Sequence, residues 1–258
     1  MVEIYQKIAD VSNNGREAAV CTIINTKGST PRKQGAKMLV YGSGSIEGTI
    51  GGGALESQVI KDALEIIKTR KPSMFSHSLL NEHGMCCGGK VDIYIEPVVR
   101  KLNLIIFGAG HIGKSLAKLA CHLDFTITLV DERAEMTDDL GKEGYNLISK
   151  NYRRAFPALP FSDTTFIAVA THDHADDRNI IAYCAKQPRA YLGMIGSKRK
   201  VEIAKKTFLA GNILTEEEMA TINWPMGLDI KVQTPQEIAV SILAKLIDVR
   251  SKIKVPYA

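Results

Sequence analysis

The 258-residue sequence contains no apolar run that approaches the roughly 20 residues a membrane-spanning helix needs. The first ten residues, MVEIYQKIAD, include acids and no apolar signal core, so we expect a cytoplasmic chain that does not associate with membranes. Cysteine is scarce: five residues with no C-x-x-C pair argue against a disulfide framework and a structural zinc site. The net charge is only +5 and is not gathered into a long basic run. These shortages exclude nucleic acid as an expected partner and favour small anionic ligands.

The stretch from residue 104 to residue 131 carries the strongest pattern in the chain. It begins with an apolar run and a G-x-G-x-x-G turn formed by Gly108, Gly110 and Gly113. An amphipathic helix and a second apolar run follow, and the second run ends at Asp131. This order is the fingerprint of a Rossmann-type dinucleotide-binding unit. Gly110 would let a pyrophosphate approach the backbone at the helix N-terminus, and Asp131 would accept hydrogen bonds from a ribose diol.

The pattern leaves the ligand of this unit open. A Rossmann scaffold also binds other ligands or none, because fold does not fix function. Arg133, two positions after the acid, could bind a phosphate or could pair with a carboxylate. The sequence therefore predicts the fold of this unit and leaves its cofactor between alternatives.

Two further glycine-rich segments come earlier in the chain. In GTIGGGALE, Gly51, Gly52 and Gly53 join a predicted strand to an amphipathic helix. They would either let an anion approach the backbone or provide a flexible turn. In NEHGMCCGGK, Cys86 and Cys87 precede two glycines. A thiolate there could be stabilised by backbone N–H groups, whereas the plain alternative is a pair of small buried residues.

Polar side chains follow the apolar strand that ends in AVA. His172 and His174 lie in the segment THDHADD, and open parallel sheets bind ligands at the carboxyl ends of their strands. The histidines could contact a ligand or a metal. Alternatively, they could face solvent while Asp173 or Asp176 caps a helix that starts near Asp177. We predict no metal site here, and we expect some ligand contact.

The segment YLGMIGSKRK is another strand followed by a turn and a basic helix start, with Gly196 and Ser197 in the turn and Arg199 in the helix. Taken in order, the elements predict an α/β protein. It has a C-terminal Rossmann-like parallel sheet with helices on both faces, and a smaller N-terminal α+β domain. We place these domains at residues 102–258 and 1–98.

Nine stretches, spanning nearly the whole chain in order, resemble the XdhC/CoxI family of xanthine dehydrogenase accessory factors. They are GSTPRKQGAKMLV (28–40), GTIGGGALE (48–56), CCGGKVDIYIEP (86–97), IIFGAGHIGKSLAKLA (105–120), VDER (130–133), VATHDHADD (169–177), YLGMIGSKRK (191–200), GLDI (227–230) and TPQEIAVSILAKLI (234–247). The GTIGGG, THDH and GMIGSKRK stretches are far more specific than the glycine fingerprint alone.

The resemblance implies an accessory protein that binds the molybdenum cofactor, as molybdopterin or its cytidine dinucleotide. It also implies assistance in cofactor sulfuration and insertion into a xanthine dehydrogenase-type apoenzyme, a cysteine desulfurase as a further partner, and a homodimer. On this basis we assign chemistry to Cys87, His172 and His174. We assign cofactor binding to Arg32, Gly51, Gly52, Gly53, Gly108, Gly110, His111, Gly113, Asp131, Arg133, Gly196, Ser197 and Arg199.

Two other functions compete with this interpretation. An NAD(P)-dependent oxidoreductase would use the glycine fingerprint for catalysis, with His172 or His174 as its acid–base group. A regulatory module would bind a nucleotide without turning it over. Steady consumption of NADH would indicate the first, whereas binding without turnover would indicate the second or the accessory protein.

Overall fold

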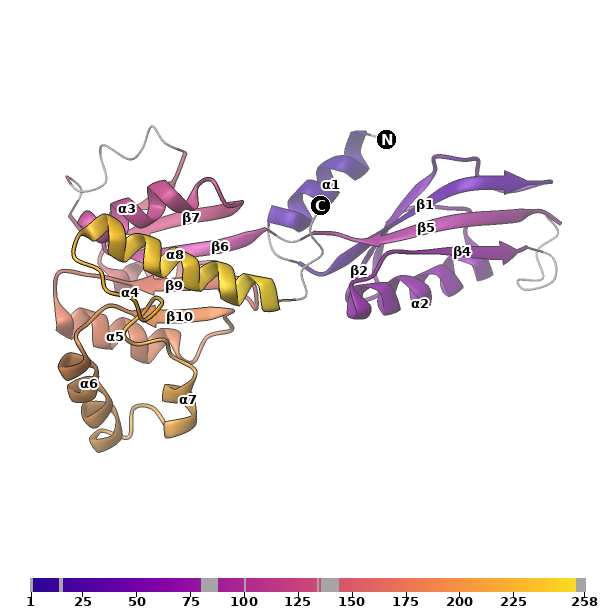
Figure 1. Ribbon diagram of the computed structural model, residues 1–258. Helices are drawn as coiled ribbons and strands as arrows, with labels where there is room; N and C mark the ends of the chain where they lie inside the picture. The colour runs from indigo at the N-terminus through magenta and orange to yellow at the C-terminus, as the bar shows by residue number, and fades with distance from the viewer. Residues whose placement is uncertain are drawn as a thin grey trace. The chain divides into compact units, whose positions relative to one another are not determined.

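The structure, a computed structural model, describes residues 2–13, 16–79, 88–99, 101–133, 135 and 144–253 (Figure 1). The chain divides into two compact units between Arg100 and Lys101. Each unit has its own sheet and its own hydrophobic core.

The first unit is an antiparallel sheet with two helices. Its elements are α1 (Val2–Asn13), β1 (Ala18–Lys27), β2 (Lys37–Tyr41), β3 (Ile46–Gly48), α2 (Gly53–Thr69), β4 (Ser73–Ser78) and β5 (Lys90–Pro97). The strand order is β3-β2-β1-β5-β4, and every pair is antiparallel.

Alternation along the strands places one set of side chains on each face of this sheet. Leu55 and Val59 of α2 pack against Cys21 and Ile93 of the sheet, all of them fully buried. Val11 of α1 belongs to a separate cluster formed by residues of the opposite parity in β1 and β2. The two helices therefore cover opposite faces of one sheet.

The second unit is a parallel sheet flanked by helices. Its strands are β6 (Leu102–Phe107), β7 (Phe125–Val130), β8 (Asn146–Ile148), β9 (Thr165–Val169) and β10 (Tyr191–Met194). Its helices are α3 (His111–Ala120), α4 (Tyr152–Ala155), the 3-10 helix η3 (Phe156–Ala158), α5 (His174–Cys184), α6 (Lys198–Ala210), α7 (Glu216–Ala220) and α8 (Pro235–Lys252). The order β10-β9-β6-β7-β8 is that of a Rossmann fold, with β6 as its first strand.

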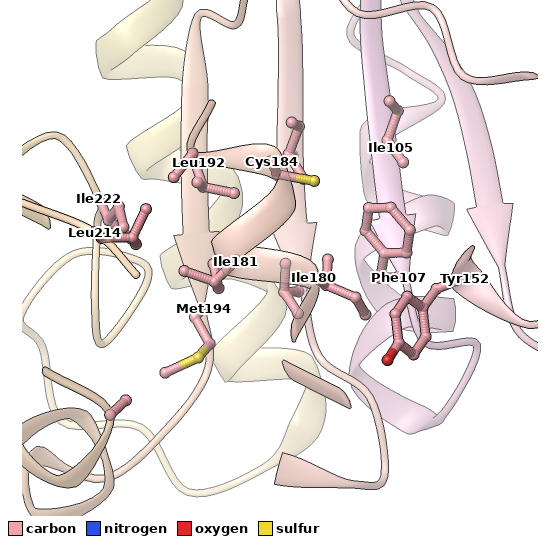
Figure 2. Close-up of a cluster of buried hydrophobic side chains, with 14 of the residues drawn as sticks. Ile105, Phe107, Tyr152, Ile180, Ile181, Cys184, Leu192, Met194, Leu214 and Ile222 are labelled. Atoms are coloured by element: carbon pink, nitrogen blue, oxygen red, sulfur yellow. The ribbon is translucent and has the colours of Figure 1, made fainter. Parts of the chain in front are cut away.

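Helices cover both faces of this sheet. On one face, Ile180 and Cys184 of α5 point toward Phe107 and Leu192 of the sheet, and together they belong to a large buried cluster (Figure 2). On the other face, Ile106 packs close to Gly113 of α3, and α8 lies along α3. The predicted fold class is confirmed by this arrangement.

Two parts of the second unit differ from the sequence prediction. Helix α5 starts at His174, three residues earlier than predicted, because Asp173 has extended backbone and caps it. Helix α4 and the following 3-10 turn form between residues 150 and 164, where the sequence analysis named no element. A four-residue helix is too short to show a periodic apolar stripe.

No helix in the described part of the chain combines the length and the apolar character needed to cross a membrane.

Candidate functional site

The glycine turn after β6 is set by close packing. Gly108 has φ +102, and a Cβ on it would collide with the carbonyl oxygen of Ala170 at the end of β9. A Cβ on Gly113 would collide with the carbonyl oxygen of Gly108. These two glycines are therefore required by the fold of the turn, whether or not a ligand binds.

Gly110 has a different role in the turn. It is the N-cap of α3, no side chain caps the helix there, and a Cβ on it would meet no atom within 4 Å. The open space beside the helix N-terminus is what close approach of an anion requires. His111 is exposed and lines a separate groove between α3 and α8, so the structure does not bring it into the pocket that contains Gly108.

Asp131 lies at the end of β7, where the fingerprint predicts it, and its side chain is only 4% exposed. Its two carboxylate oxygens accept four hydrogen bonds from N–H groups of the same chain. The donors are the backbone N–H of Ala109 (2.8 Å), the backbone N–H of Arg133 (3.1 Å), and Nε (2.9 Å) and Nη2 (2.8 Å) of Arg133. Burial opposes ionisation, but the bonds from Arg133 and Ala109 outweigh it and hold the pKa of Asp131 below its ordinary value.

A narrow pocket opens at the carboxyl ends of β6, β7 and β9. Its apolar walls are formed by Phe107, Val130, Tyr152 and Ile180. Its polar lining residues are Asp131, Glu132, Lys150, Thr171, His172 and Asp176. Apolar walls with a few polar groups are typical of small-molecule sites. Of the two predicted histidines, the structure places only His172 among the residues that line this pocket.

His174 instead belongs to a chain of polar contacts that joins α5 to α6. Its Nδ1 lies 3.2 Å from Oδ2 of Asp177, and its Nε2 is within hydrogen-bonding distance of Nζ of Lys200. Asp177 is 1% exposed and also accepts hydrogen bonds from the backbone N–H (3.0 Å) and hydroxyl (2.7 Å) of Thr171. Because the Lys200 ammonium only donates, His174 must accept at Nε2 and donate from Nδ1, which fixes its tautomer.

Burial of Asp177 in this chain raises the pKa of its carboxyl, and the bonds from Thr171 and His174 offset only part of that effect. Asp173 caps α5, its Oδ1 accepting from the backbone N–H of Ala175 at 2.7 Å, as one of the two sequence alternatives predicted. Asp176, the other alternative, lines the pocket. In the described part of the chain, no group of three or more His, Cys, Asp and Glu residues is placed to hold a metal ion.

The basic turn after β10 caps α6. Ser197 is the N-cap, and its hydroxyl accepts from the backbone N–H of Lys200 at 3.4 Å. Arg199 is exposed, and Gly196 is half-buried. The THDH and GSKRK segments therefore meet through His174 and Lys200. The sequence analysis had named Gly196, Ser197 and Arg199 on the second segment, and not Lys200.

In the first unit, two glycine-rich segments of the sequence converge on the loop GSTPR. A Cβ on Gly51, which has φ +138, would lie 2.5 Å from Cγ of Pro31. Gly89, which follows the two adjacent cysteines, packs against the backbone of Ser29. The glycine segments predicted separately are therefore both neighbours of one loop. Cys86 and Cys87 lie outside the described residues.

The glycine segment at the start of α2 donates hydrogen bonds to a carboxylate of the same chain, that of Glu56. Oε1 of Glu56 accepts from the hydroxyl of Thr49 (2.5 Å) and from the backbone N–H groups of Ile50 (3.1 Å) and Gly52 (2.9 Å). Burial opposes ionisation of Glu56, but these bonds keep its pKa below the ordinary value. Arg32 is exposed and lines a different pocket with Lys7, Lys37 and Glu47.

Sequence reasoning assigned no specific role to three residues that organise these sites. Glu56 looks in the sequence like any acidic residue of an amphipathic helix. Its place in the first turn of α2 is nevertheless a signal, because an acid there can accept hydrogen bonds from the backbone N–H groups that precede the helix. Asp177 and Lys200 stand in the sequence only as members of charged segments. Their partnership through His174 depends on the packing of α5 beside α6, which no local pattern contains.

These features define a class of protein: a Rossmann-type unit with a pocket at the carboxyl edge of its sheet, joined to an antiparallel α+β unit rich in glycine turns. A profile of the XdhC Rossmann domain matches residues 104–246, and a profile of the XdhC and CoxI family matches residues 11–78. The chain belongs to the XdhC and CoxI family.

Curated relatives agree with that assignment. The chain is 32% identical over 256 residues to the uncharacterized protein YqeB of Escherichia coli (strain K12), covering 97% of this chain and 47% of that protein. It is 32% identical over 170 residues to a protein of Bacillus subtilis (strain 168) described as a probable xanthine dehydrogenase component, covering 64% of this chain and 48% of that protein. The chain thus spans about half the length of these relatives.

A solved structure has the same fold. The crystal structure of a xanthine dehydrogenase from Bacillus halodurans is 20% identical, with a TM-score of 0.52, and the match covers 99% of this chain and 97% of that one.

Proposed function

We propose that this chain is an accessory protein that binds the molybdenum cofactor and assists its sulfuration and insertion into a xanthine dehydrogenase-type hydroxylase. The observation that carries the proposal is the match of family profiles to both units, residues 11–78 and 104–246. Its partners would be a xanthine dehydrogenase-type apoenzyme and a cysteine desulfurase. The chain would act as a homodimer.

The residues of the pocket suit such a group. Molybdopterin combines a flat heterocycle with an anionic phosphate. Phe107, Val130 and Ile180 offer apolar walls for the ring, and Lys150 and His172 offer polar contacts. The uncapped N-terminus of α3 beside Gly110 offers N–H groups for the phosphate. When bound, the cofactor would supply the redox chemistry of the target hydroxylase, and this chain would hold and shield it.

The first test is anaerobic equilibrium binding of the molybdenum cofactor to the purified chain, followed by transfer to an apohydroxylase. His172→Ala should weaken cofactor binding, because His172 lines the pocket. His122→Ala is the matched control, since His122 is exposed in the turn after α3. Binding by the wild-type chain that is lost in His172→Ala and retained in His122→Ala supports the proposal. A chain that binds no cofactor and does not raise hydroxylase activity overturns it.

A second candidate is an NAD(P)-dependent oxidoreductase. The observation that favours it is the presence of His172 in the same pocket as Asp131, where an acid–base group would face a bound dinucleotide. Anaerobic incubation with NADH and a panel of aldehydes and purines would test it. Catalytic oxidation of NADH would support this candidate, and its absence over a range of pH would remove it.

A further inference from the structure

The Rossmann pocket differs from a dinucleotide site at the residue that should bind the ribose. In such sites the acid after the second strand accepts hydrogen bonds from the ribose hydroxyls. A carboxylate has about four lone-pair positions. In this chain all four are used by N–H donors of Ala109 and Arg133, at 2.8 to 3.1 Å from the Asp131 oxygens.

The guanidinium of Arg133 also covers the carboxylate. Its Nε and Nη2 donate in parallel to the two oxygens of Asp131, which is the bidentate geometry of a strong ion pair. The Asp131 side chain is 4% exposed, whereas the Arg133 side chain is 31% exposed. Asp131 lines the pocket with both of its oxygens already bonded to Arg133, whereas a dinucleotide site presents a free acid.

Displacing Arg133 with a ribose would be unfavourable. A diol would offer two neutral O–H donors to the carboxylate, whereas Arg133 offers two parallel N–H donors that also carry the opposite charge. The backbone N–H of Arg133 is a third donor to the same carboxylate, and it is fixed by the turn after β7. The low pKa of Asp131 agrees with a carboxylate that stays ionised within these bonds.

We propose that Arg133 is a specificity-determining residue that closes the Asp131 carboxylate to a ribose diol and so excludes NAD(H) from the Rossmann pocket. The ligand of the pocket is then held through its ring and its phosphate, without a diol contact at Asp131. This role concerns nucleotide selectivity: it argues against the NAD(P)-dependent oxidoreductase named above, and it stands whether or not the chain binds the molybdenum cofactor.

The test compares ADP with 2′,3′-dideoxyadenosine diphosphate by isothermal titration calorimetry, together with NADH by fluorescence titration. In the wild-type chain the diol should confer no advantage, so ADP and the dideoxy analogue should bind within about twofold of each other, or neither should bind. In Arg133→Ala, Asp131 can accept from the diol, and ADP should bind about tenfold more tightly than the analogue. NADH affinity should rise by a similar factor.

Two further variants make the result specific. Arg133→Ala combined with Asp131→Asn should lose the tenfold gain, because the carboxylate that accepts the diol is gone. Lys206→Ala, which removes one exposed charge from α6, should behave as the wild type. If Arg133→Ala fails to fold, Arg133→Lys keeps the cation without two parallel donors, and the same diol preference is expected. A tenfold preference for ADP in the wild-type chain, or no preference in a folded Arg133 variant, overturns the proposal.

Discussion

The side-chain carboxylate of Glu56 accepts a hydrogen bond from the backbone N–H of Gly52 at 2.9 Å, four residues earlier and at the N-cap of the same helix. The N–H of Ile50 and the hydroxyl of Thr49 converge on the same oxygen. An acid of the chain thus takes the place that an external anion would take at this glycine turn.

Replacing Glu56 with Ala should loosen the turn and free its donors. Loss of a hydrogen-bond acceptor for these partly buried N–H groups costs about 1 kcal/mol, so hydrogen exchange at residues 50–55 should accelerate. Glu56→Gln keeps an oxygen acceptor and should show a smaller effect. Hydrogen exchange measured by mass spectrometry decides the point, with Glu65→Ala on the same helix as control. Unchanged exchange in Glu56→Ala would show that the bonds contribute nothing to the order of the turn.

The same carboxylate predicts a pH dependence of stability. The pKa of Glu56 in the folded state lies below its ordinary value of 4.5. Its contribution is therefore present above that ordinary value, and it is lost as the pH falls through the folded pKa. The difference in melting temperature between the wild type and Glu56→Gln, followed by circular dichroism, should shrink below about pH 4.5. A difference that grows on acidification would contradict this assignment.

The two glycines of the Rossmann turn should respond differently to alanine. Gly113→Ala places a Cβ on the carbonyl of Gly108 and should destabilise the second unit by about 3 kcal/mol or more. Gly110→Ala meets no neighbour and has φ −71, so it should fold normally while it obstructs a ligand at the helix N-terminus. Urea unfolding followed through Trp224, which lies in the second unit, measures both. Equal destabilisation by the two variants would refute the distinction.

Asp177 should make stability depend on pH in the opposite direction to Glu56. Because burial raises its folded pKa, its favourable contribution is present below its ordinary value of 3.8 and is lost as the pH rises through the folded pKa. The stability of the wild type relative to Asp177→Asn should therefore be greater at about pH 4 than at about pH 8, as measured by urea unfolding. Repeating the comparison in a His174→Ala background removes the contribution of the imidazole. If the stability difference between the wild type and Asp177→Asn is the same at both pH values, the pKa of Asp177 is not raised by burial and this prediction is wrong.

Cys87 remains a prediction of the sequence, since it lies outside the described residues. If its thiol holds or relays sulfur, Cys87→Ala should retain cofactor binding and lose most of the activation of the target hydroxylase. Cys121→Ala is the control, because Cys121 is an exposed free thiol in the second unit. Full activation by Cys87→Ala would remove this thiol from the mechanism.

Local patterns in the sequence were enough to predict the elements whose partners lie nearby in the chain. Glycine spacing, apolar runs and an acid after the second run predicted the Rossmann unit, since each turn, strand and helix requires those residues at those places. Helices α7 and α8 begin with capping boxes formed by Thr215 with Glu218 and by Thr234 with Glu237. Their partners lie within four residues, so the chain itself contains the information.

Packing in three dimensions settled how the candidate residues are used. His172 and His174 are two positions apart, yet one lines the pocket and the other bonds Asp177 and Lys200. For Arg133 the sequence left a phosphate or a carboxylate partner open, and the turn after β7 brings its guanidinium back onto Asp131, so the carboxylate pairing forms. Hydrogen-bond capacity is shared among groups that meet only after folding, so residue type and spacing name the candidates while packing decides which atoms remain available.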